Sequence, residues 1–322
     1  MTARTASTAM TSVEYRGRQL RFAGSQATLT LDLDAGASVI SWVPREVPVE
    51  LMFQPPTTGP YKDVTGWYVL LPNAGPGGRA NGIDYSRHGD IRTKAWKLDD
   101  ARVDPDGWSI LMTVSSSEVP LSVERRLQID ASGTRCRMTE VLRNVGGDPI
   151  EFLWGHHVTF SDRLADGARI WSSAQRWTSL PHYQPLLSQL DLGASGPLDR
   201  LPGHTRPSID CSVVDTTSTQ EMLFSSRLRE GRAAVNNDRL GLQVEIVWDE
   251  TILPFLWLWQ HNGDTECGRG LALEPQSSDV PGMQDAFNSG RSMRLEVGEE
   301  RELYISLELT QLAALDHRYP TT

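Results

Sequence analysis

Two histidines and one glutamate are the residues of this chain best suited to acid–base chemistry. His156 and His157 are adjacent in the apolar segment 152–160, and Glu274 ends the apolar run 271–274. A histidine titrates near neutral pH and a carboxylate can be tuned to accept a proton, so together they can move protons in both directions. A polar group in an apolar, strand-like segment needs a partner or a function. The pattern therefore indicates acid–base chemistry on a neutral substrate.

The adjacency of the two histidines limits what they can do together. Successive side chains of a strand point to opposite faces, so only one of the pair can face a given cleft. This spacing argues against a metal ion held by both, and a lone strand histidine is more often a hydrogen-bonded structural residue than a catalyst. Glu274 precedes a proline, which predicts a strand end opening into a loop. Partial burial there would raise its pKa and make it a better base at neutral pH.

Two other segments carry groups that could bind a sugar. Residues 71–82 contain four glycines and two prolines, which demand an irregular backbone, but no phosphate-binding glycine motif. A surface loop is the simpler explanation, and the density of polar side chains in and after the segment favours hydroxyl binding instead. These side chains are Asn73, Arg79, Asn81, Arg87 and His88. Trp257 and Trp259 share strand parity and could form an aromatic wall against sugar C–H faces, although a core stripe is the commoner explanation.

Composition restricts the classes of partner. The chain has 322 residues and a formal net charge of -10, which disfavours binding to a nucleic-acid backbone. The three cysteines, Cys136, Cys211 and Cys267, form no CxxC pattern, so neither a disulfide framework nor a zinc cluster is indicated. A reducing, cytoplasmic setting is the simplest interpretation. No run approaches the roughly 18 apolar residues that cross a membrane, so no membrane partner is expected. Oligomeric state stays open.

The elements that position these residues are predicted to be antiparallel strands. Apolar side chains alternate with polar ones at 29–34, 121–129, 242–248, 293–297 and 303–309. Such alternation is typical of strands with one buried face. Gly-, Asp- and Pro-containing turns separate the segments at 104–107, 130–133 and 297–300. The pair Arg125-Arg126 interrupts one alternating run and is predicted to lie on a solvated face.

The strands extend along the whole chain without a linker-like segment. A convincing long amphipathic helix is missing, and only residues 310–316 could form a short helical turn or two. We therefore expect an all-β fold, with residues 13–322 forming one antiparallel β-sandwich domain after a disordered tail at 1–12. The segment 181–206 has irregular apolar spacing with many prolines and glycines, so we expect a long excursion that borders a binding site.

Together these segments resemble the aldose 1-epimerase (galactose mutarotase-like) family. The chain resembles a divergent member of that family. The resemblance rests on the order of motifs over roughly residues 20–310. Arg79-Ala80-Asn81 is followed by His88-Gly89 and Trp96. His157 stands three positions before Phe160, and Leu273-Glu274-Pro275 precedes Asp285-Ala286-Phe287-Asn288 and a closing segment at 295–299.

The resemblance implies a β-supersandwich with a sugar cleft on one sheet and a reaction that needs no metal or cofactor. In the family a glutamate takes the proton of the anomeric hydroxyl while a histidine protonates the ring oxygen. The ring opens, C1 rotates, and closure gives the other anomer with the proton roles reversed. Carried over by position, Glu274 is the base and His157 the acid.

The resemblance also supplies substrate contacts. His88 and Arg79 would bind hydroxyls near the reacting carbon, with Asn81 and Trp257 beside them. His156, at a position where many relatives have asparagine, would support the site. Asp238 is the candidate for the aspartate that binds a sugar hydroxyl in galactose-type relatives. The galactose-type motifs are replaced here by Ala80-Asn81-Gly82 and His88-Gly89-Asp90, so the identity of the sugar stays open.

Two alternative functions are compatible with the same residues. One is a hexose-6-phosphate 1-epimerase, in which Arg79 and Arg87 would hold the phosphate, because arginine forks match phosphate oxygens. The other is a non-catalytic carbohydrate-binding protein that has kept the cleft. Retention of both proposed proton-transfer residues favours an isomerase over the binding protein.

Overall fold

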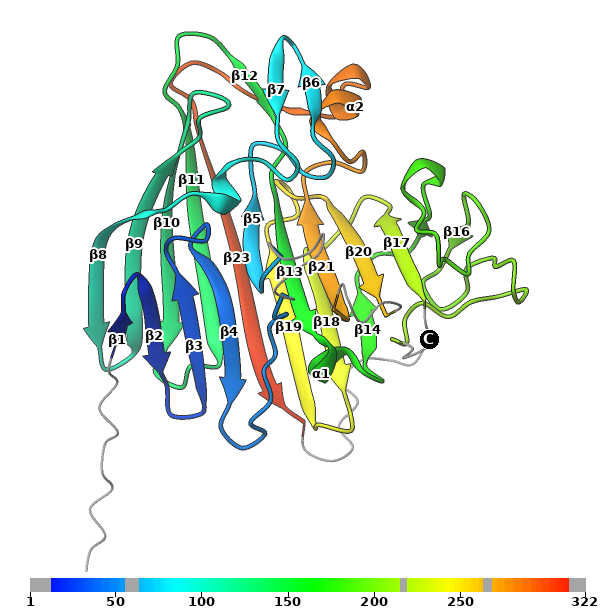
Figure 1. The fold of residues 1–322 in the computed structure, drawn as a ribbon, viewed down its shortest axis with the longest axis horizontal. Helices are drawn as coiled ribbons and strands as arrows, with labels where there is room; N and C mark the ends of the chain where they lie inside the picture. The colour runs from blue at the N-terminus through cyan, green and yellow to red at the C-terminus, as the bar shows by residue number, and fades with distance from the viewer. Residues whose placement is uncertain (1–12, 56–63, 215–218, 263–267, 313–322) are drawn as a thin grey trace, which may run out of the picture.

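The alternating segments form antiparallel strands in the computed structural model, which describes residues 13–55, 64–214, 219–262 and 268–312. Most of these strands belong to two large sheets, as Figure 1 shows. The first has eleven strands in the order β1 (Val13–Arg16), β2 (Gln19–Ala23), β3 (Ala27–Asp32), β4 (Ser38–Pro44), β5 (Trp67–Leu70), β13 (Gly155–Ser161), β21 (Gly270–Gln276), β20 (Phe255–His261), β17 (Gln220–Ser225), β15 (Trp177–Thr178) and β16 (Ser195–Gly196).

The second sheet has eight strands. Their order is β14 (Arg169–Ser172), β18 (Arg232–Asn237), β19 (Leu242–Trp248), β23 (Glu300–Gln311), β11 (Arg135–Asn144), β10 (Leu121–Asp130), β9 (Gly107–Ser115) and β8 (Lys97–Asp104). Two small two-stranded sheets lie at one end together with the helix α2 (Met283–Asn288). One pairs β6 (Gly78–Ala80) with β7 (Ile83–Tyr85), and the other pairs β12 (Ile150–Phe152) with β22 (Met293–Leu295). The predicted all-β antiparallel sandwich is confirmed.

The core lies between the inner faces of the two large sheets. On β10 the apolar positions Leu121, Val123, Leu127 and Ile129 are fully buried, and the alternate positions face outward. Turn 130–133 closes the β10–β11 hairpin, so Leu127 lies opposite Met138 and both are buried. Burial of these apolar faces is what holds the two layers together.

One prediction about this core is wrong. Arg125 shares the parity of the buried leucines and valine, and it is fully buried rather than solvated. Its Nη2 lies 2.6 Å from Oε1 of Glu140 on β11, and its Nη1 donates to the carbonyl of Ala37 at 2.8 Å. Its guanidinium also stacks 4.2 Å from the ring centre of Trp96. A buried arginine of this kind is tolerated because its charge is paired with a carboxylate and its N–H groups reach a carbonyl.

Two segments outside the sheets approach the binding region. Residues 71–91 carry the β6–β7 hairpin and lead into the 3-10 turn η1 (Ile91–Thr93). The segment 181–206 is mainly irregular, with the 3-10 turn η2 (Pro181–Tyr183) and the short strand β16, and it projects to one side in Figure 1. It is the excursion that the sequence predicts.

Some predictions fall at the ends of the described residues. The short helix α1 (Asp162–Ala165) was not anticipated, and the helix predicted at 310–316 is wrong where it can be checked, because β23 continues through Gln311. The predicted tail at 1–12 lies outside the described residues, as does Cys267. Within the described ranges no helix is long and apolar enough to cross a membrane.

Candidate functional site

The candidate site is built on the outer face of the eleven-stranded sheet, where one row of side chains crosses five neighbouring strands. Tyr68 on β5 lies directly opposite His157 on β13. The β13–β21 register pairs Gly155 with Gln276 and Val158 with Leu273, which sets His157 opposite Glu274. Glu274 in turn is paired with Trp257 on β20, and Trp257 with Phe224 on β17. Antiparallel registry thus joins residues that are far apart in the sequence.

His157 and Glu274 are in direct contact at the floor of a cavity of about 400 Å³. Nε2 of His157 lies 3.3 Å from Oε1 of Glu274. Nδ1 of His157 lies 2.6 Å from the Thr159 hydroxyl, and Tyr68 stacks on the imidazole with ring centres 4.8 Å apart. The histidine ring is therefore fixed at both nitrogens and on one face.

A glutamine holds the other oxygen of the glutamate. Nε2 of Gln276, two residues along β21 on the same face, donates to Oε2 of Glu274 at 3.2 Å. Gly155 leaves room for the glutamine in this position, since a Cβ at residue 155 would lie 1.9 Å from Oε1 of Gln276. Glu274 therefore has one oxygen on His157 and the other on Gln276.

His88 reaches the same cavity from the 71–91 segment. Its φ of 62° is a left-handed conformation that is uncommon for residues other than glycine, and Gly89 follows with a φ of 72°. Nδ1 of His88 accepts a hydrogen bond from the backbone N–H of Gly75 at 3.2 Å. Because Nδ1 is an acceptor, the ring proton of neutral His88 is on Nε2, which can donate to a ligand.

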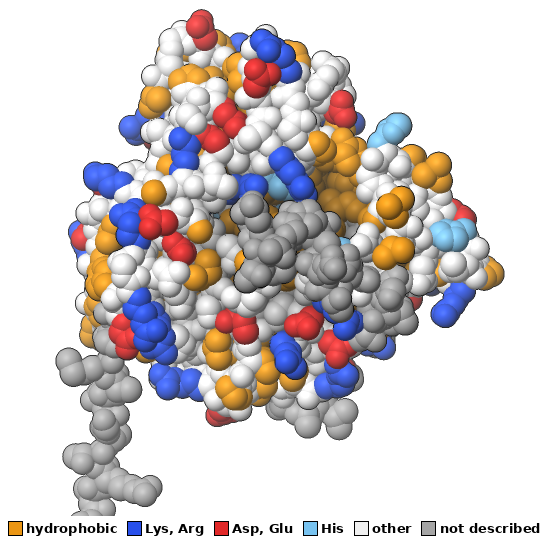
Figure 2. All heavy atoms as spheres, viewed as in Figure 1, with side chains coloured by type: hydrophobic (Ala, Val, Ile, Leu, Met, Phe, Trp, Pro, Cys, Tyr) orange, Lys and Arg blue, Asp and Glu red, His pale blue; other side chains and the backbone are white. Residues whose placement is uncertain are grey.

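Aromatic side chains form the walls of the cavity. Trp257, Trp259, Phe224 and Tyr183 line it, and the Phe224 ring packs edge-on against Trp257 with centres 5.2 Å apart. Tyr183 comes from the 181–206 excursion and donates to the carbonyl of Pro281 at 3.0 Å. In Figure 2 a hollow with hydrophobic walls is visible, with a histidine inside it and Lys or Arg side chains at its border.

Burial shifts the pKa values of the floor in opposite directions. Burial raises the pKa of Glu274 to about 8, although the hydrogen bond from Gln276 and the charge of Arg87 lower it. Burial lowers the pKa of His157 to about 3, and the charges of Arg92 and Arg87 add to that effect. The pKa of His88 is likewise well below its usual range, mainly through burial. These shifts favour a protonated glutamate and neutral histidines near neutral pH.

His156 lies on the other side of β13, in the core. Its Nδ1 accepts from Nε1 of Trp67 at 3.1 Å, so Nε2 carries the proton that faces Oε2 of Glu140 at 3.2 Å. Nε1 of Trp154 also donates to Oε2 of Glu140, at 3.0 Å. Burial would raise the pKa of Glu140, but Arg125 and His156 hold that pKa at about 2. His156 is therefore a link between the two sheets and does not reach the cavity, contrary to its prediction as a substrate contact.

Three other residues predicted to bind substrate also lie away from the cavity. Arg79 is exposed and pairs with Asp84 at 3.3 Å across the β6–β7 hairpin. Asn81 is the exposed turn residue of that hairpin, with a φ of 47°. Asp238 is exposed in the turn that joins β18 and β19 of the other sheet. The structure thus brings together His157, Glu274, His88 and Trp257. Arg79, Asn81 and Asp238 lie away from this group.

His157 and Glu274 touch each other, and no space the size of a sugar ring separates them. Residues that the sequence analysis did not weigh as site residues include Thr159 and Gln276, which hold His157 and Glu274 from two positions along the same strands. Strand parity alone could have identified both. Tyr68 and Tyr183 had no such signal, because their contacts depend on strand order and on an irregular loop.

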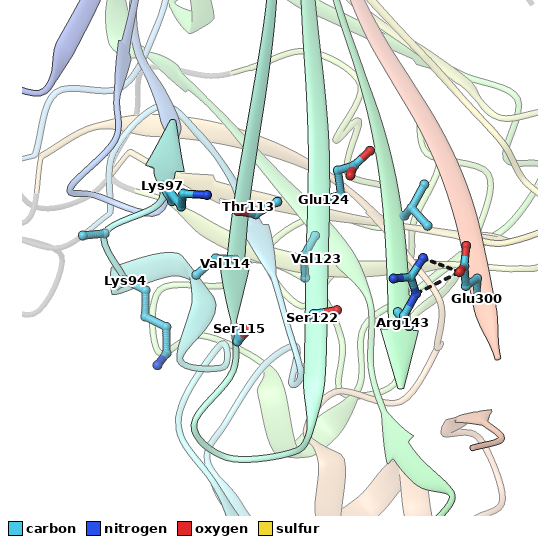
Figure 3. A pocket seen from close by; sticks show the side chains of 12 residues that line it. Lys94, Lys97, Thr113, Val114, Ser115, Ser122, Val123, Glu124, Arg143 and Glu300 are labelled. Carbon is cyan, nitrogen blue, oxygen red and sulfur yellow. Dashed lines mark hydrogen bonds and ion pairs between the residues drawn. The ribbon is translucent and has the colours of Figure 1, made fainter. Parts of the chain in front are cut away.

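A second hollow, of about 640 Å³, lies on the outer face of the eight-stranded sheet (Figure 3). Its walls are polar strand residues such as Lys97, Thr113 and Glu124, and the Nε of Arg143 in it donates to Oε1 of Glu300 at 2.8 Å. It is the larger hollow, but it contains no histidine and none of the predicted catalytic residues. Among the described residues no three His, Cys, Asp or Glu side chains are grouped to hold a metal ion.

Several solved structures share the fold of this chain. The Slr1438 protein from Synechocystis sp. PCC 6803 is 17% identical, with 97% of this chain and 100% of that chain covered and a TM-score of 0.69. A galactose mutarotase-like protein from Clostridium acetobutylicum is 14% identical over 94% and 98% of the two chains, with a TM-score of 0.68. A galactose mutarotase related enzyme from Lactobacillus acidophilus is 15% identical over 91% and 98%, with a TM-score of 0.61. The chain therefore has the galactose mutarotase-like fold.

Within that class the sequence identifies a family. Residues 71–309 match the family model described as a domain of unknown function (DUF4432), and the chain belongs to this family. No curated protein matches the chain. The matched region includes His88, His157 and Glu274.

Proposed function

We propose that this protein is an aldose 1-epimerase, an isomerase that interconverts the α and β anomers of a free sugar. The observation that carries the proposal is the 3.3 Å contact between His157 and Glu274 on the floor of a cavity walled by aromatic rings. A cavity of about 400 Å³ is within the range of roughly 300–1,000 Å³ that small-molecule sites occupy. The setting we propose is the cytoplasm, which suits the free, buried thiols of Cys136 and Cys211.

The proton count of the pair suits a reversible ring opening. Protonated Glu274 with neutral His157 contains as many protons as the ion pair in which the proton has moved to His157. One group accepts the proton of the anomeric hydroxyl, the C1–O5 bond breaks, and the other group donates a proton to O5. After rotation about C1 the same two transfers run backward, so the pair returns to its starting state without solvent.

Burial decides which form the pair adopts before the substrate arrives. Since burial favours protonated Glu274 and neutral His157, the assignment of Glu274 as the first acceptor requires its proton to pass to His157 over the 3.3 Å contact as the sugar binds. We infer that sugar hydroxyls supply the polar surroundings that make this transfer possible. Nε2 of His88 then donates a hydrogen bond to a sugar oxygen, and the rings of Trp257 and Phe224 cover C–H faces.

The two alternatives stand differently against these contacts. A phosphate site made of Arg79 and Arg87 is not supported, because Arg79 is paired with Asp84 outside the cavity. A binding protein without catalysis would use the same walls, and it is distinguished by turnover alone. The contact of a neutral histidine with a protonated carboxylate favours catalysis, since a binding site for neutral hydroxyls does not need a transferable proton.

Polarimetry of freshly dissolved α-sugars tests the proposal. A panel of hexoses, pentoses, deoxy sugars, uronates and hexose 6-phosphates is followed with the wild type, Glu274→Gln and His157→Asn. We expect the wild type to accelerate anomerisation and each variant to lose about 10²–10⁴-fold of that acceleration. Acceleration by the wild type that both variants retain, or none for any sugar, contradicts the proposal. Calorimetric binding without turnover would instead identify a binding protein.

A further inference from the structure

Arg87 is the one cation among the described residues that line the cavity. It directly precedes His88, is exposed to solvent, and shares the cavity with His157 and Glu274. An exposed residue that lines a cavity stands where the cavity opens, and Lys or Arg side chains border the hollow in Figure 2. No described carboxylate pairs with its guanidinium. Arg79, eight residues earlier, is by contrast held by Asp84.

The charge of Arg87 lowers the pKa values of the three titratable residues at the floor of the cavity. It lowers the pKa of Glu274, and together with Arg92 it lowers the pKa of His157 and of His88. Glu274 is the only carboxylate among the described lining residues, and burial keeps it protonated near neutral pH. Near neutral pH Arg87 is therefore the one full charge among the described lining residues, and it is positive although the chain has a formal net charge of -10. A local field opposite to that of the whole molecule selects the charge of the ligand.

We propose that the substrate is a sugar with one anionic substituent, a carboxylate or a phosphate monoester, which the unpaired guanidinium of Arg87 binds at the mouth of the cavity. The inference rests on the proposed function, because it assigns the reducing end of that sugar to His157 and Glu274. A guanidinium presents parallel N–H donors that match the two oxygens of a carboxylate or of a phosphate. The aromatic walls supply no competing charge.

Binding of matched neutral and anionic sugars tests the inference. Galactose is compared with galacturonate, and glucose with glucose 6-phosphate, by quenching of the tryptophan fluorescence that Trp257 and Trp259 give to the cavity. We expect at least one anionic sugar to bind the wild type about 10- to 100-fold more tightly than its neutral parent, as hydrogen bonds to charged groups allow. The carboxylate and phosphate arms identify which anion is preferred.

Arg87→Gln and Arg79→Gln are the matched variants. In Arg87→Gln the ratio of anionic to neutral affinity should fall toward one, and in Arg79→Gln it should stay at the wild-type value. In the wild type, added salt should weaken binding of the anionic sugar more than binding of the neutral sugar. Equal affinities of the wild type for neutral and anionic sugars, or an unchanged ratio in Arg87→Gln, overturns the inference.

The design separates this inference from the proposed function. Binding does not require the ring to open, so a protein that binds galacturonate through Arg87 without accelerating its anomerisation would support the inference and contradict the isomerase. A protein that accelerates the anomerisation of neutral sugars through Glu274 and has no preference for an anionic sugar would support the isomerase and contradict the inference.

Discussion

Two buried histidine–glutamate pairs lie on opposite faces of β13, and they differ in what surrounds the carboxylate. His156 meets Glu140 at 3.2 Å between the sheets, and His157 meets Glu274 at 3.3 Å under the cavity. Glu140 also contacts the buried guanidinium of Arg125, and its pKa is held at about 2 despite burial. Glu274 has only the amide of Gln276 on its other oxygen, and burial raises its pKa to about 8.

The difference shows how one motif can serve structure or chemistry. A counter-charge in contact with Glu140 fixes its ionised form, so this carboxylate has no proton to give and the inner pair joins the two sheets. Without such a contact Glu274 keeps its proton, and the outer pair can transfer it to a ligand in the cavity. A buried carboxyl group whose pKa lies near neutral pH is typical of a general acid or base.

The largest expected effect comes from removing the carboxylate of the outer pair. Glu274→Gln should lower the acceleration of anomerisation by about 10²–10⁴-fold, because the amide cannot exchange a proton with His157 or the sugar. Its fold should be retained, since glutamine keeps the shape and the contact with Gln276. Polarimetry gives the rate and circular dichroism gives the fold. A variant that is folded and fully active would remove Glu274 from the mechanism.

The same substitution in the inner pair should act on stability. Glu140→Gln leaves the buried guanidinium of Arg125 without its counter-ion, and breaking such a pair costs about 3–5 kcal/mol. Urea denaturation of both variants at pH 7 measures the free energy of unfolding. The comparison between the faces fails if Glu274→Gln loses as much stability as Glu140→Gln.

The pH dependence of stability should have opposite signs for the two carboxylates. The pKa of Glu274 is raised above its unfolded value of 4.5, so its contribution is complete below pH 4.5 and is lost as pH rises through about 8. The pKa of Glu140 is lowered, so its contribution is present above pH 4.5 and is lost as pH falls through about 2. The stability of Glu274→Gln relative to the wild type should therefore rise as pH increases from 4.5 to about 8.

Unfolding free energies measured at several pH values check this. About 1.4 kcal/mol accompanies each unit of pKa difference, which sets the upper scale of the gain. A difference in unfolding free energy between Glu274→Gln and the wild type that does not change from pH 4.5 to 9 would mean that the carboxylate is ionised at no cost. In that case the outer pair would resemble the inner one.

Activity should have a plateau between the two pKa values of the outer pair. Above a pH of about 8 the pair loses its transferable proton. Below a pH of about 3 both His157 and Glu274 are protonated, so no proton acceptor is left. Both proton arrangements of the pair give the same limits, because the limits belong to the pair as a unit. Rates from pH 5 to 10 should show the upper limit; a rate that keeps rising above pH 9 contradicts it.

How much of this contrast the sequence could predict depends on the periodicity of strands. Alternation predicts that His156 and His157 face opposite ways, and they do. The same rule places Arg125 with its buried neighbours, but its charge led to the opposite prediction. Glu140, which explains both His156 and Arg125, is a cross-strand and cross-sheet partner that no local pattern indicates.

The loop residues were harder to predict for a different reason. Arg79, Asn81, Arg87 and His88 lie in one polar segment, and their side chains diverge because the backbone turns at positive φ. The hairpin turns Arg79 toward Asp84, whereas the left-handed His88 returns to the cavity. A periodic element would have fixed these directions, and an irregular one leaves them to contacts with the rest of the fold.

The smallest effect, and the sharpest test of the outer pair, comes from Gln276. Gln276→Leu removes the hydrogen bond that lowers the pKa of Glu274, so the alkaline limit of activity should move above pH 8 and the rate should fall a few-fold. Oε1 of Gln276 has no partner among the described residues, so the change loses little else. Gln260 on the neighbouring strand β20 provides the control, because its amide donates to the carbonyl of Cys211 at 2.8 Å and not to Glu274. If Gln260→Leu moves the alkaline limit as far as Gln276→Leu does, the shift reflects a loosened sheet, and the proton of the outer pair is not set by its glutamine.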